Sequence, residues 1–294
     1  MTQDPALTSD HVKKAVKTLK NLRPAYKPIL EFYEQIFVAQ EDAKSHIQID
    51  PIHISADILA AKAEENLPLI SMSEFVIDGQ SAEALLGNIC DIAAGANEIM
   101  KNSAKTLRKA QQDQKLDMNL LFSGLLEEND TYFAEIAEEN GIDQEILAFL
   151  IYNSIQPSLA LCAEQLSTYL PENTPWESGY CPICGAYPGL SVLEGEGVRF
   201  LFCGFCWHKW EAKRIFCPFC ENSDSKTLQY FYSEEEKDLR VDVCDSCKKY
   251  IKTIDARKAE RDIYPPLEQI STLHLDIQAR EKGLESGAHL SLQG

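Results

Sequence analysis

The sequence predicts an α+β fold in which an all-α helical N-terminal domain precedes two tandem four-cysteine metal modules and a C-terminal helix. Apolar residues recur at helical spacing through most of the N-terminal half. Four Cys-x-x-C pairs then follow, with short alternating segments between them that are typical of β-hairpins. We therefore expect a helical domain at 1–172, metal modules at 173–212 and 213–262, and a C-terminal helix and tail at 263–294.

The N-terminal domain has the apolar periodicity of a helical bundle. Its first apolar stripe consists of Val12, Val16, Leu19 and Leu22. Gly141 is expected to end one helix, and Asp143 to cap the next. The stretch that follows is the most apolar, and Pro157 should break it into two helices because proline lacks a backbone donor and clashes with the preceding turn. Its richest apolar run, Ile146–Ile151, is too short to cross a bilayer.

Each metal module is expected to contain one β-hairpin between two cysteine pairs. A linker of turn-forming residues at 171–179 leads into the first module. The hairpins are expected at 190–202 and 228–243, and the second has an acidic tip at 234–238. A basic strand should follow Cys247. The last helix is expected to carry Ile270, Leu273, Ile277 and Leu284 and to end near Gly283.

Charge and the N-terminal residues indicate a cytoplasmic protein that does not bind nucleic acid. The net charge is −18, and residues 1–180 hold 13 basic and 28 acidic side chains. Such a molecule repels nucleic acid. The first residues lack the basic and apolar regions of a secretory signal. In a reducing cytoplasm, paired cysteines indicate metal binding or redox catalysis more often than disulfides.

The four cysteine pairs are expected to hold two metal ions, iron or zinc, with one ion in each module. A Cys-x-x-C turn directs two sulfurs to one point, and two such turns complete a tetrahedron around a soft divalent ion. Consecutive pairing keeps loop closure local, although an interleaved pairing stays open. The expected metal ligands are Cys181, Cys184, Cys203 and Cys206 in one site and Cys217, Cys220, Cys244 and Cys247 in the other.

Several roles fit such sites. Four thiolates leave no open coordination position, which argues against hydrolysis at the metal, and no nucleophile–base arrangement or phosphate loop is present, so we expect no enzyme activity. A structural clip is the simplest role, because small hairpin modules bury too little core to fold unaided. A rubredoxin-like one-electron carrier is an alternative, since the same geometry holds iron. A zinc-ribbon scaffold or nucleic-acid-binding protein is weaker because of the negative charge.

Other candidate residues have simpler interpretations. Cys90 and Cys162 lie on apolar helix faces and are expected to be core residues. His208 follows Cys206 closely, but that site has four sulfurs without it, so we expect a solvated strand residue. The basic run at 248–261 contrasts with the acidic molecule and is a candidate contact for an acidic partner surface.

The cysteine-rich part of the chain resembles the FdhE family of formate dehydrogenase accessory proteins. The resemblance rests on Tyr-Cys-Pro-Ile-Cys-Gly at 180–185, Cys-Gly-Phe-Cys at 203–206 with Trp210, Cys-Pro-Phe-Cys at 217–220, and Cys-Asp-Ser-Cys-Lys-Lys-Tyr-Ile-Lys at 244–252. The order and spacing of all four pairs match the family. One departure is Glu211, where some members place a histidine, so any role of that histidine does not transfer.

This resemblance implies a helical domain followed by two rubredoxin-like modules, with the eight cysteines as metal ligands. It also implies a cytoplasmic maturation factor, acting as a chaperone, that binds the catalytic subunit of a formate dehydrogenase. Neither nucleic-acid binding nor membrane insertion is expected, and self-association stays open.

Overall fold

The computed structural model describes residues 8–171, 176–232 and 236–288. The predicted linker at 171–179, the acidic hairpin tip at 234–238 and the C-terminal tail therefore lie partly outside the described residues. Internal contacts divide the described chain into a helical unit and a sheet unit. The helical unit comprises residues 8–51 and 72–162, and the sheet unit comprises 52–71 and 163–288.

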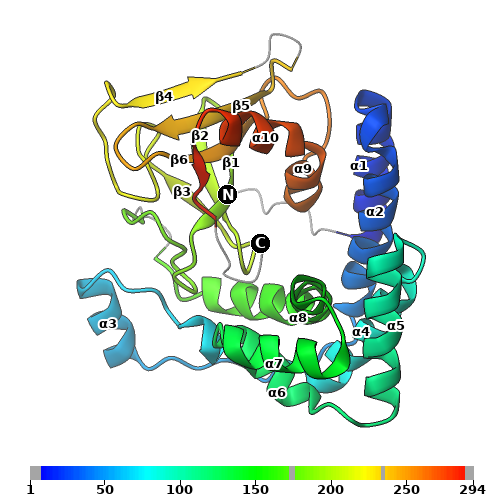
Figure 1. Cartoon of the computed structure of the whole chain (residues 1–294). Helices are drawn as coiled ribbons and strands as arrows, with labels where there is room; N and C mark the ends of the chain where they lie inside the picture. The colour runs from blue at the N-terminus through cyan, green and yellow to red at the C-terminus, as the bar shows by residue number, and fades with distance from the viewer. Residues whose placement is uncertain (1–7, 172–175, 233–235, 289–294) are drawn as a thin grey trace. The chain divides into compact units, whose positions relative to one another are not determined.

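The helical unit confirms the all-α prediction for this part of the chain (Figure 1). Its helices are α1 (Ser9–Leu22), α2 (Lys27–Ala43), α4 (Gly79–Ala93), α5 (Glu98–Gln112), α6 (Met118–Leu126), α7 (Asp130–Asn140) and most of α8 (Gln144–Ser167). In α1, Val12, Val16 and Leu19 are buried, as the apolar stripe predicts, but Leu22, the last residue of the stripe and of the helix, is 57% exposed, so its inclusion was wrong. Gly141 ends α7 in the left-handed conformation, and the Ile146 amide donates to Asp143 Oδ1 at 3.1 Å, so both predicted helix ends are confirmed.

Pro157 does not break the helix, and the prediction that it would is wrong. α8 runs continuously from Gln144 to Ser167. A proline leaves the carbonyl four residues earlier without its intrahelical donor. Here that carbonyl belongs to Asn153, and it accepts a hydrogen bond from buried Gln40 Nε2 at 2.8 Å. Leu150, Ile155 and Leu159 are fully buried on the same helix. Burial of each is worth about 1.5–3 kcal/mol, which together exceeds the ~3 kcal/mol cost of an interior proline.

Because it is not broken at Pro157, α8 is 24 residues long, longer than either of the two helices expected there. Among the described residues, α8 is the one helix long and apolar enough to cross a membrane by length and composition. Of its most apolar window, 67% is buried within the protein. Core helices of soluble proteins commonly meet both criteria.

One continuous sheet joins both predicted hairpins. The described strands are β1 (Pro188–Glu194), β2 (Val198–Cys203), β3 (Lys209–Ala212), β4 (Leu228–Phe231), β5 (Leu239–Cys244), β6 (Lys249–Asp255) and β7 (Glu285–Ser286). Their order is β3-β2-β1-β6-β5-β4, with β7 beside β6. The antiparallel pairs β1–β2 and β4–β5 are the predicted hairpins. A parallel pair between Ser191–Leu193 and Thr253–Asp255 connects the two halves.

The predicted C-terminal helix is two short helices, α9 (Pro265–Ser271) and α10 (Leu273–Glu281). Buried Leu275 and Ala279 of α10 belong to the same apolar cluster as Leu190 and Val241 of the sheet. Ile277, expected on the apolar face, is instead 58% exposed. The break at Thr272 shifts the helical register, so the apolar face predicted for one continuous helix does not form.

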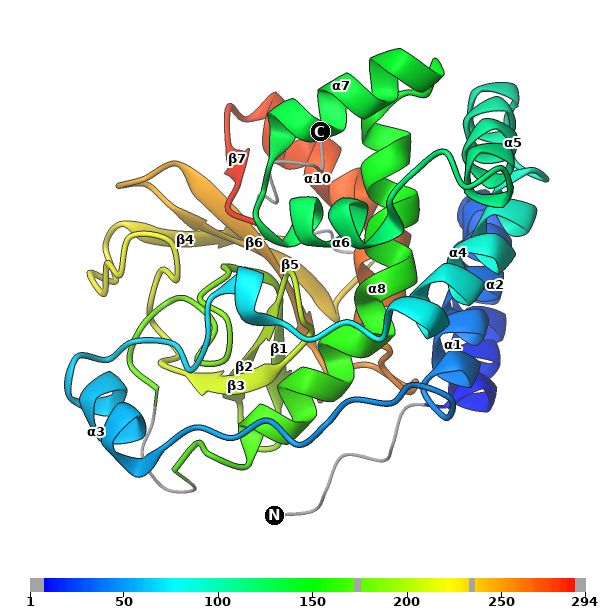
Figure 2. The same ribbon diagram turned by 90° about the horizontal axis from the view of Figure 1, so that it is seen from below.

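Residues 52–71 belong to the sheet unit although both flanking segments belong to the helical unit. They contain the short helix α3 (Ala56–Glu64) and a following extended segment (Figure 2). The Leu69 amide donates to Pro182 O and the Ile70 amide to Ile183 O, both at 2.9 Å. Tyr180 Oη also donates to Asn66 O at 2.7 Å. This segment therefore pairs with the first cysteine turn.

Candidate metal centres

The eight cysteine sulfurs gather in two groups, and the grouping is consecutive, as the spacing predicts. In each group the four sulfur atoms lie within 4.8 Å of one another. None of the ten cysteines forms a disulfide. The groups are Cys181, Cys184, Cys203 and Cys206 (the first cluster) and Cys217, Cys220, Cys244 and Cys247 (the second cluster).

Distances within each cluster fit a four-coordinate ion. In the first cluster, Sγ–Sγ distances are 3.6 Å for Cys184–Cys203 and 3.8 Å for Cys181–Cys206. In the second they are 3.6 Å for Cys220–Cys244 and 3.7 Å for Cys217–Cys247. A tetrahedron with metal–sulfur bonds of about 2.3 Å has sulfur–sulfur edges of about 3.8 Å. Disulfide sulfurs would lie at about 2.05 Å. The donor set and its spacing therefore suit zinc or iron.

Each pair sits on a tight turn whose last residue has a positive φ. The residue after the second cysteine is Gly185, Trp207, Glu221 or Lys248, with φ of 78°, 61°, 59° and 60°. Glycine adopts this conformation without strain, whereas in each of the other three residues it costs about 1–2 kcal/mol of conformational free energy. In the third turn, Cys217 N donates to Asn222 O at 2.8 Å and Glu221 N to Cys217 O at 2.9 Å. Such strain persists only where surrounding contacts enforce the turn.

Backbone and side-chain N–H groups donate hydrogen bonds to some of the sulfurs. Cys203 Sγ accepts from the amides of Phe205 and Cys206 at 3.3 and 3.4 Å. In the second cluster, Asn222 Nδ2 donates to Cys244 Sγ at 3.6 Å. Hydrogen bonds of this kind stabilise thiolate charge, which a four-sulfur site concentrates.

The two clusters differ in exposure. All four cysteines of the first cluster are buried. In the second, Cys217 and Cys244 are buried, Cys247 is half-buried and Cys220 is exposed. Solvent and competing ligands therefore reach the second cluster more easily than the first.

Within each cluster, one thiol has a lowered pKa and two have a raised pKa. Burial raises the pKa of Cys181 well above its usual value. Burial also acts on Cys203, but hydrogen bonds from the other three thiols outweigh it and hold the pKa of Cys203 well below the usual value. In the second cluster, burial of Cys244 is outweighed by hydrogen bonds from the Cys247 amide and Asn222, which lower its pKa to about 6. Metal ligation requires thiolates, so affinity should rise with pH as the remaining thiols ionise.

Contacts between the two modules place their cysteine turns together. A Cβ on Gly179 would lie 1.8 Å from Pro218 O, so only glycine allows this approach. Gly179 N donates to Glu221 Oε1 at 3.2 Å. The rings of Tyr187 and Phe219 meet edge to face with centroids 5.8 Å apart.

Two cysteines and one histidine that the sequence singled out lie outside both clusters. Cys90 and Cys162 are buried, as expected, and burial raises their pKa values to about 12 and about 11. His208 precedes β3 rather than lying in it; it stacks on Trp210, and burial lowers its pKa to about 4. It belongs to neither cluster. The expectation of a solvated strand residue is wrong.

Five of the six cationic side chains in the basic run at 248–261 form ion pairs. The paired residues are Lys248, Lys252, Arg257, Lys258 and Arg261. Their partners lie within the sheet unit, so most of this charge is neutralised internally. Lys249 is instead placed 5.9 Å from the centroid of the Tyr187 ring and 6.0 Å from that of Phe219.

Two family models match the cysteine-rich part of the chain. Residues 180–214 match the family model for the FdhE central domain, and residues 215–292 match that for the FdhE C-terminal domain. A relative named Protein FdhE homolog from Aquifex aeolicus is 36% identical over 149 residues, which are 49% of this chain and 51% of the relative. That match spans about half the relative's length. The protein of the same name from Haemophilus ducreyi is 27% identical over 293 residues, covering 95% of this chain and 88% of the relative.

Similarity to a solved structure extends over nearly the whole chain. The crystal structure of the FdhE protein from Pseudomonas aeruginosa matches with a TM-score of 0.68 at 20% identity. The match covers 97% of this chain and 96% of the other. This likeness shows that the helical and cysteine-rich parts together form the fold of that protein.

Proposed function

We propose that this chain, whose residues 180–214 and 215–292 match the central and C-terminal domains of the FdhE family, is a formate dehydrogenase accessory protein. In this proposal it binds the catalytic subunit of a formate dehydrogenase in the cytoplasm and assists assembly of the active enzyme. It performs no catalysis itself. Two modules, residues 173–212 and 213–262, are each stabilised by a metal ion and support the surface that the catalytic subunit contacts.

Sulfur geometry is the observation that supports the metal part of this proposal. Edges of 3.6–3.8 Å match a tetrathiolate site in both clusters. The first cluster's four cysteines would hold one ion and the second cluster's four another. A bound ion would neutralise half of the thiolate charge and cross-link two hairpin turns. Because four sulfurs complete a tetrahedral site, substrate has no coordination position to occupy.

Co-purification with the client tests the proposed function. The tagged full-length chain is co-expressed with the formate dehydrogenase catalytic subunit of its host, and the retained subunit is quantified by mass spectrometry. We expect the wild-type chain to retain the subunit. The double variant Cys217→Ser/Cys220→Ser should retain at least tenfold less, because the second module loses its ion. Cys162→Ala removes a buried cysteine outside both clusters and is the matched control.

Two outcomes would count against the proposal. If wild-type chain retains no catalytic subunit, the proposed client is wrong. If the double variant retains as much as the Cys162→Ala control, the second module does not support the docking surface.

One observation favours a second candidate function, that of a one-electron carrier. Cys220 is exposed, so an iron ion in the second cluster would lie near solvent, where a redox partner can approach. Iron would give a visible thiolate-to-metal band that bleaches reversibly on reduction. A colourless protein with two zinc ions would exclude this role.

A further inference from the structure

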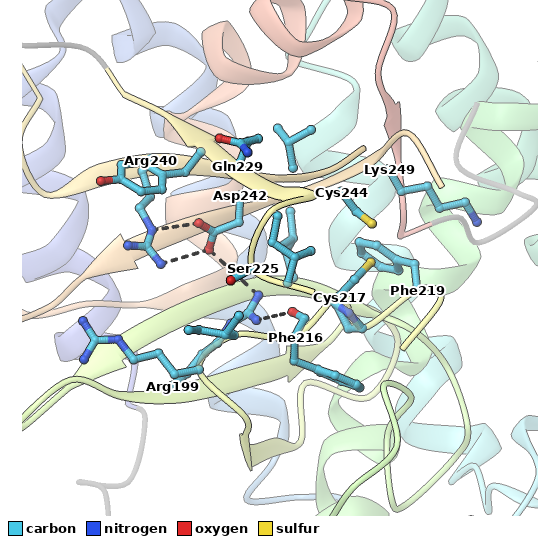
Figure 3. A pocket seen from close by; sticks show the side chains of 17 residues that line it. Arg199, Phe216, Cys217, Phe219, Ser225, Gln229, Arg240, Asp242, Cys244 and Lys249 are labelled. Carbon is cyan, nitrogen blue, oxygen red and sulfur yellow. Dashed lines mark hydrogen bonds and ion pairs between the residues drawn. The ribbon is translucent and has the colours of Figure 1, made fainter. Parts of the chain in front are cut away.

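A cationic cavity lies beside the second cluster. Its volume is about 340 Å³, and Cys217 and Cys244 form part of its wall. Four cationic side chains and one carboxylate also line it, and Figure 3 shows how they are arranged. These are Arg199, Arg214, Arg240, Lys249 and Asp242. In a chain with a net charge of −18, four cations around one small cavity form a local reversal of charge.

Asp242 is one carboxylate beside two arginines, buried Arg199 and half-buried Arg240. Its Oδ1 lies 2.9 Å from Arg240 Nε, and its Oδ2 accepts from Arg240 Nη2 at 3.2 Å. Oδ2 also accepts from Thr253 Oγ1 at 2.6 Å. The distance from Asp242 Oδ2 to Arg199 Nη2 is 3.9 Å, beyond a hydrogen bond.

Arg199 therefore has donors without an acceptor. Its side chain is 3% exposed, its Nε donates to Ser191 Oγ at 3.0 Å, and its Nη1 donates to Phe216 O at 2.7 Å. The buried Nη2 has no hydrogen-bond partner. Figure 3 shows this guanidinium between Asp242 and the Phe216 carbonyl, on the wall of the cavity. A buried cation with unused donors is costly unless an anion compensates it.

The charge of Cys217 acts on the Arg199 guanidinium, but the hydrogen bonds to the cluster sulfurs come from other donors. Within the described parts of the chain, the side-chain donor to Cys244 Sγ is Asn222. The side chains of Arg199 and Arg240 donate to Ser191, Phe216 and Asp242 instead. Arg214 lies at the exposed edge of the cavity. The exposed Arg214 side chain and the half-buried Lys249 side chain can therefore reach a group inside the cavity, while Arg199 adds buried positive charge to its wall.

We propose that this cavity binds the oxyanion group, phosphate or carboxylate, of a small ligand. Guanidinium groups present paired donors that match both kinds of oxyanion. A volume of about 340 Å³ is at the lower end of small-molecule sites, which excludes a folded partner as the occupant. Tyr230, which also lines the cavity, is 59% exposed and has the Arg240 guanidinium 5.1 Å from its ring centroid. Its ring provides an apolar surface beside the anion position.

Titration calorimetry on the metal-loaded full chain tests this inference. Inorganic phosphate and acetate are titrated separately, with chloride keeping ionic strength constant. We expect saturable binding of at least one probe. Phosphate binding alone identifies a phosphate ligand, and acetate binding alone identifies a carboxylate. Arg214→Gln and Lys249→Gln should each weaken binding at least tenfold. Arg214 is exposed and Lys249 is half-buried, so both substitutions carry less risk of a folding defect than replacement of buried Arg199.

Lys213→Gln is the matched control. Lys213 neighbours Arg214, is 53% exposed and does not line the cavity. Its replacement should leave the dissociation constant within twofold of wild type. Absence of binding for both probes would overturn the inference, as would equal weakening by all three substitutions. This experiment involves no formate dehydrogenase, so its failure is separate from failure of the proposed function.

Discussion

Replacing Cys203 with serine is expected to leave one metal ion per chain and to unfold the first metal module. Cys203 Sγ is buried, lies 3.6 Å from Cys184 Sγ and accepts two backbone hydrogen bonds. A hydroxyl is a poor ligand for a soft ion, so the first cluster would lose its fourth donor. Structural tetrathiolate ions contribute on the order of 10 kcal/mol to folding, which exceeds the stability of a small hairpin module.

Elemental analysis and thermal unfolding measure this effect together. Cys90→Ala is the matched control, because Cys90 is also a buried cysteine but lies on α4 outside both clusters. The control should keep two ions and lose only about 1–2 kcal/mol for the missing buried group. If Cys203→Ser keeps two ions and unfolds like the control, Cys203 is not a metal ligand.

A chelator is expected to remove the two ions in separate phases, with the second cluster emptied at least tenfold faster. Cys220 is exposed and Cys247 half-buried, whereas all four cysteines of the first cluster are buried. A chelator needs access to a sulfur–metal bond to begin exchange. The first cluster offers this access only after local opening, which costs free energy. A chromogenic chelator in stopped flow records both phases.

Variants assign the phases. Cys220→Ser should lack the fast phase, and Cys203→Ser should lack the slow one. Release of both ions in a single phase would show that exposure does not control exchange. Persistence of the fast phase in Cys220→Ser would place the labile ion elsewhere.

Local features of this chain could be predicted because neighbouring residues determine them. Cys181 and Cys184 are three residues apart on one turn, so their sulfurs must converge wherever the turn lies. The hairpins and the helix ends at Gly141 and Asp143 likewise depend on adjacent residues. Consecutive grouping of the cysteines followed from short loop closure.

Features that depend on distant residues could not be predicted. The hydrogen bond from Tyr180 Oη to Asn66 O spans 114 residues. The Gln40 side chain that satisfies the Asn153 carbonyl is 113 residues away, so the residues next to Pro157 predict a break that this distant contact prevents. The cavity likewise depends on residues that are distant in the sequence. Arg199 and Asp242 have no characteristic spacing, and they meet because the parallel β1–β6 pair joins the two hairpins.

Metal content of the full chain, purified without oxygen and analysed by mass spectrometry, tests the central claim most directly. Each of the two groups of four cysteine sulfurs can hold one ion, so we expect two ions per chain, which should be iron, zinc or one of each. Two equivalents, with none of the eight clustered thiols reactive until a chelator is added, are the expected result. A folded chain that contains no metal and has eight freely reactive thiols would contradict the account.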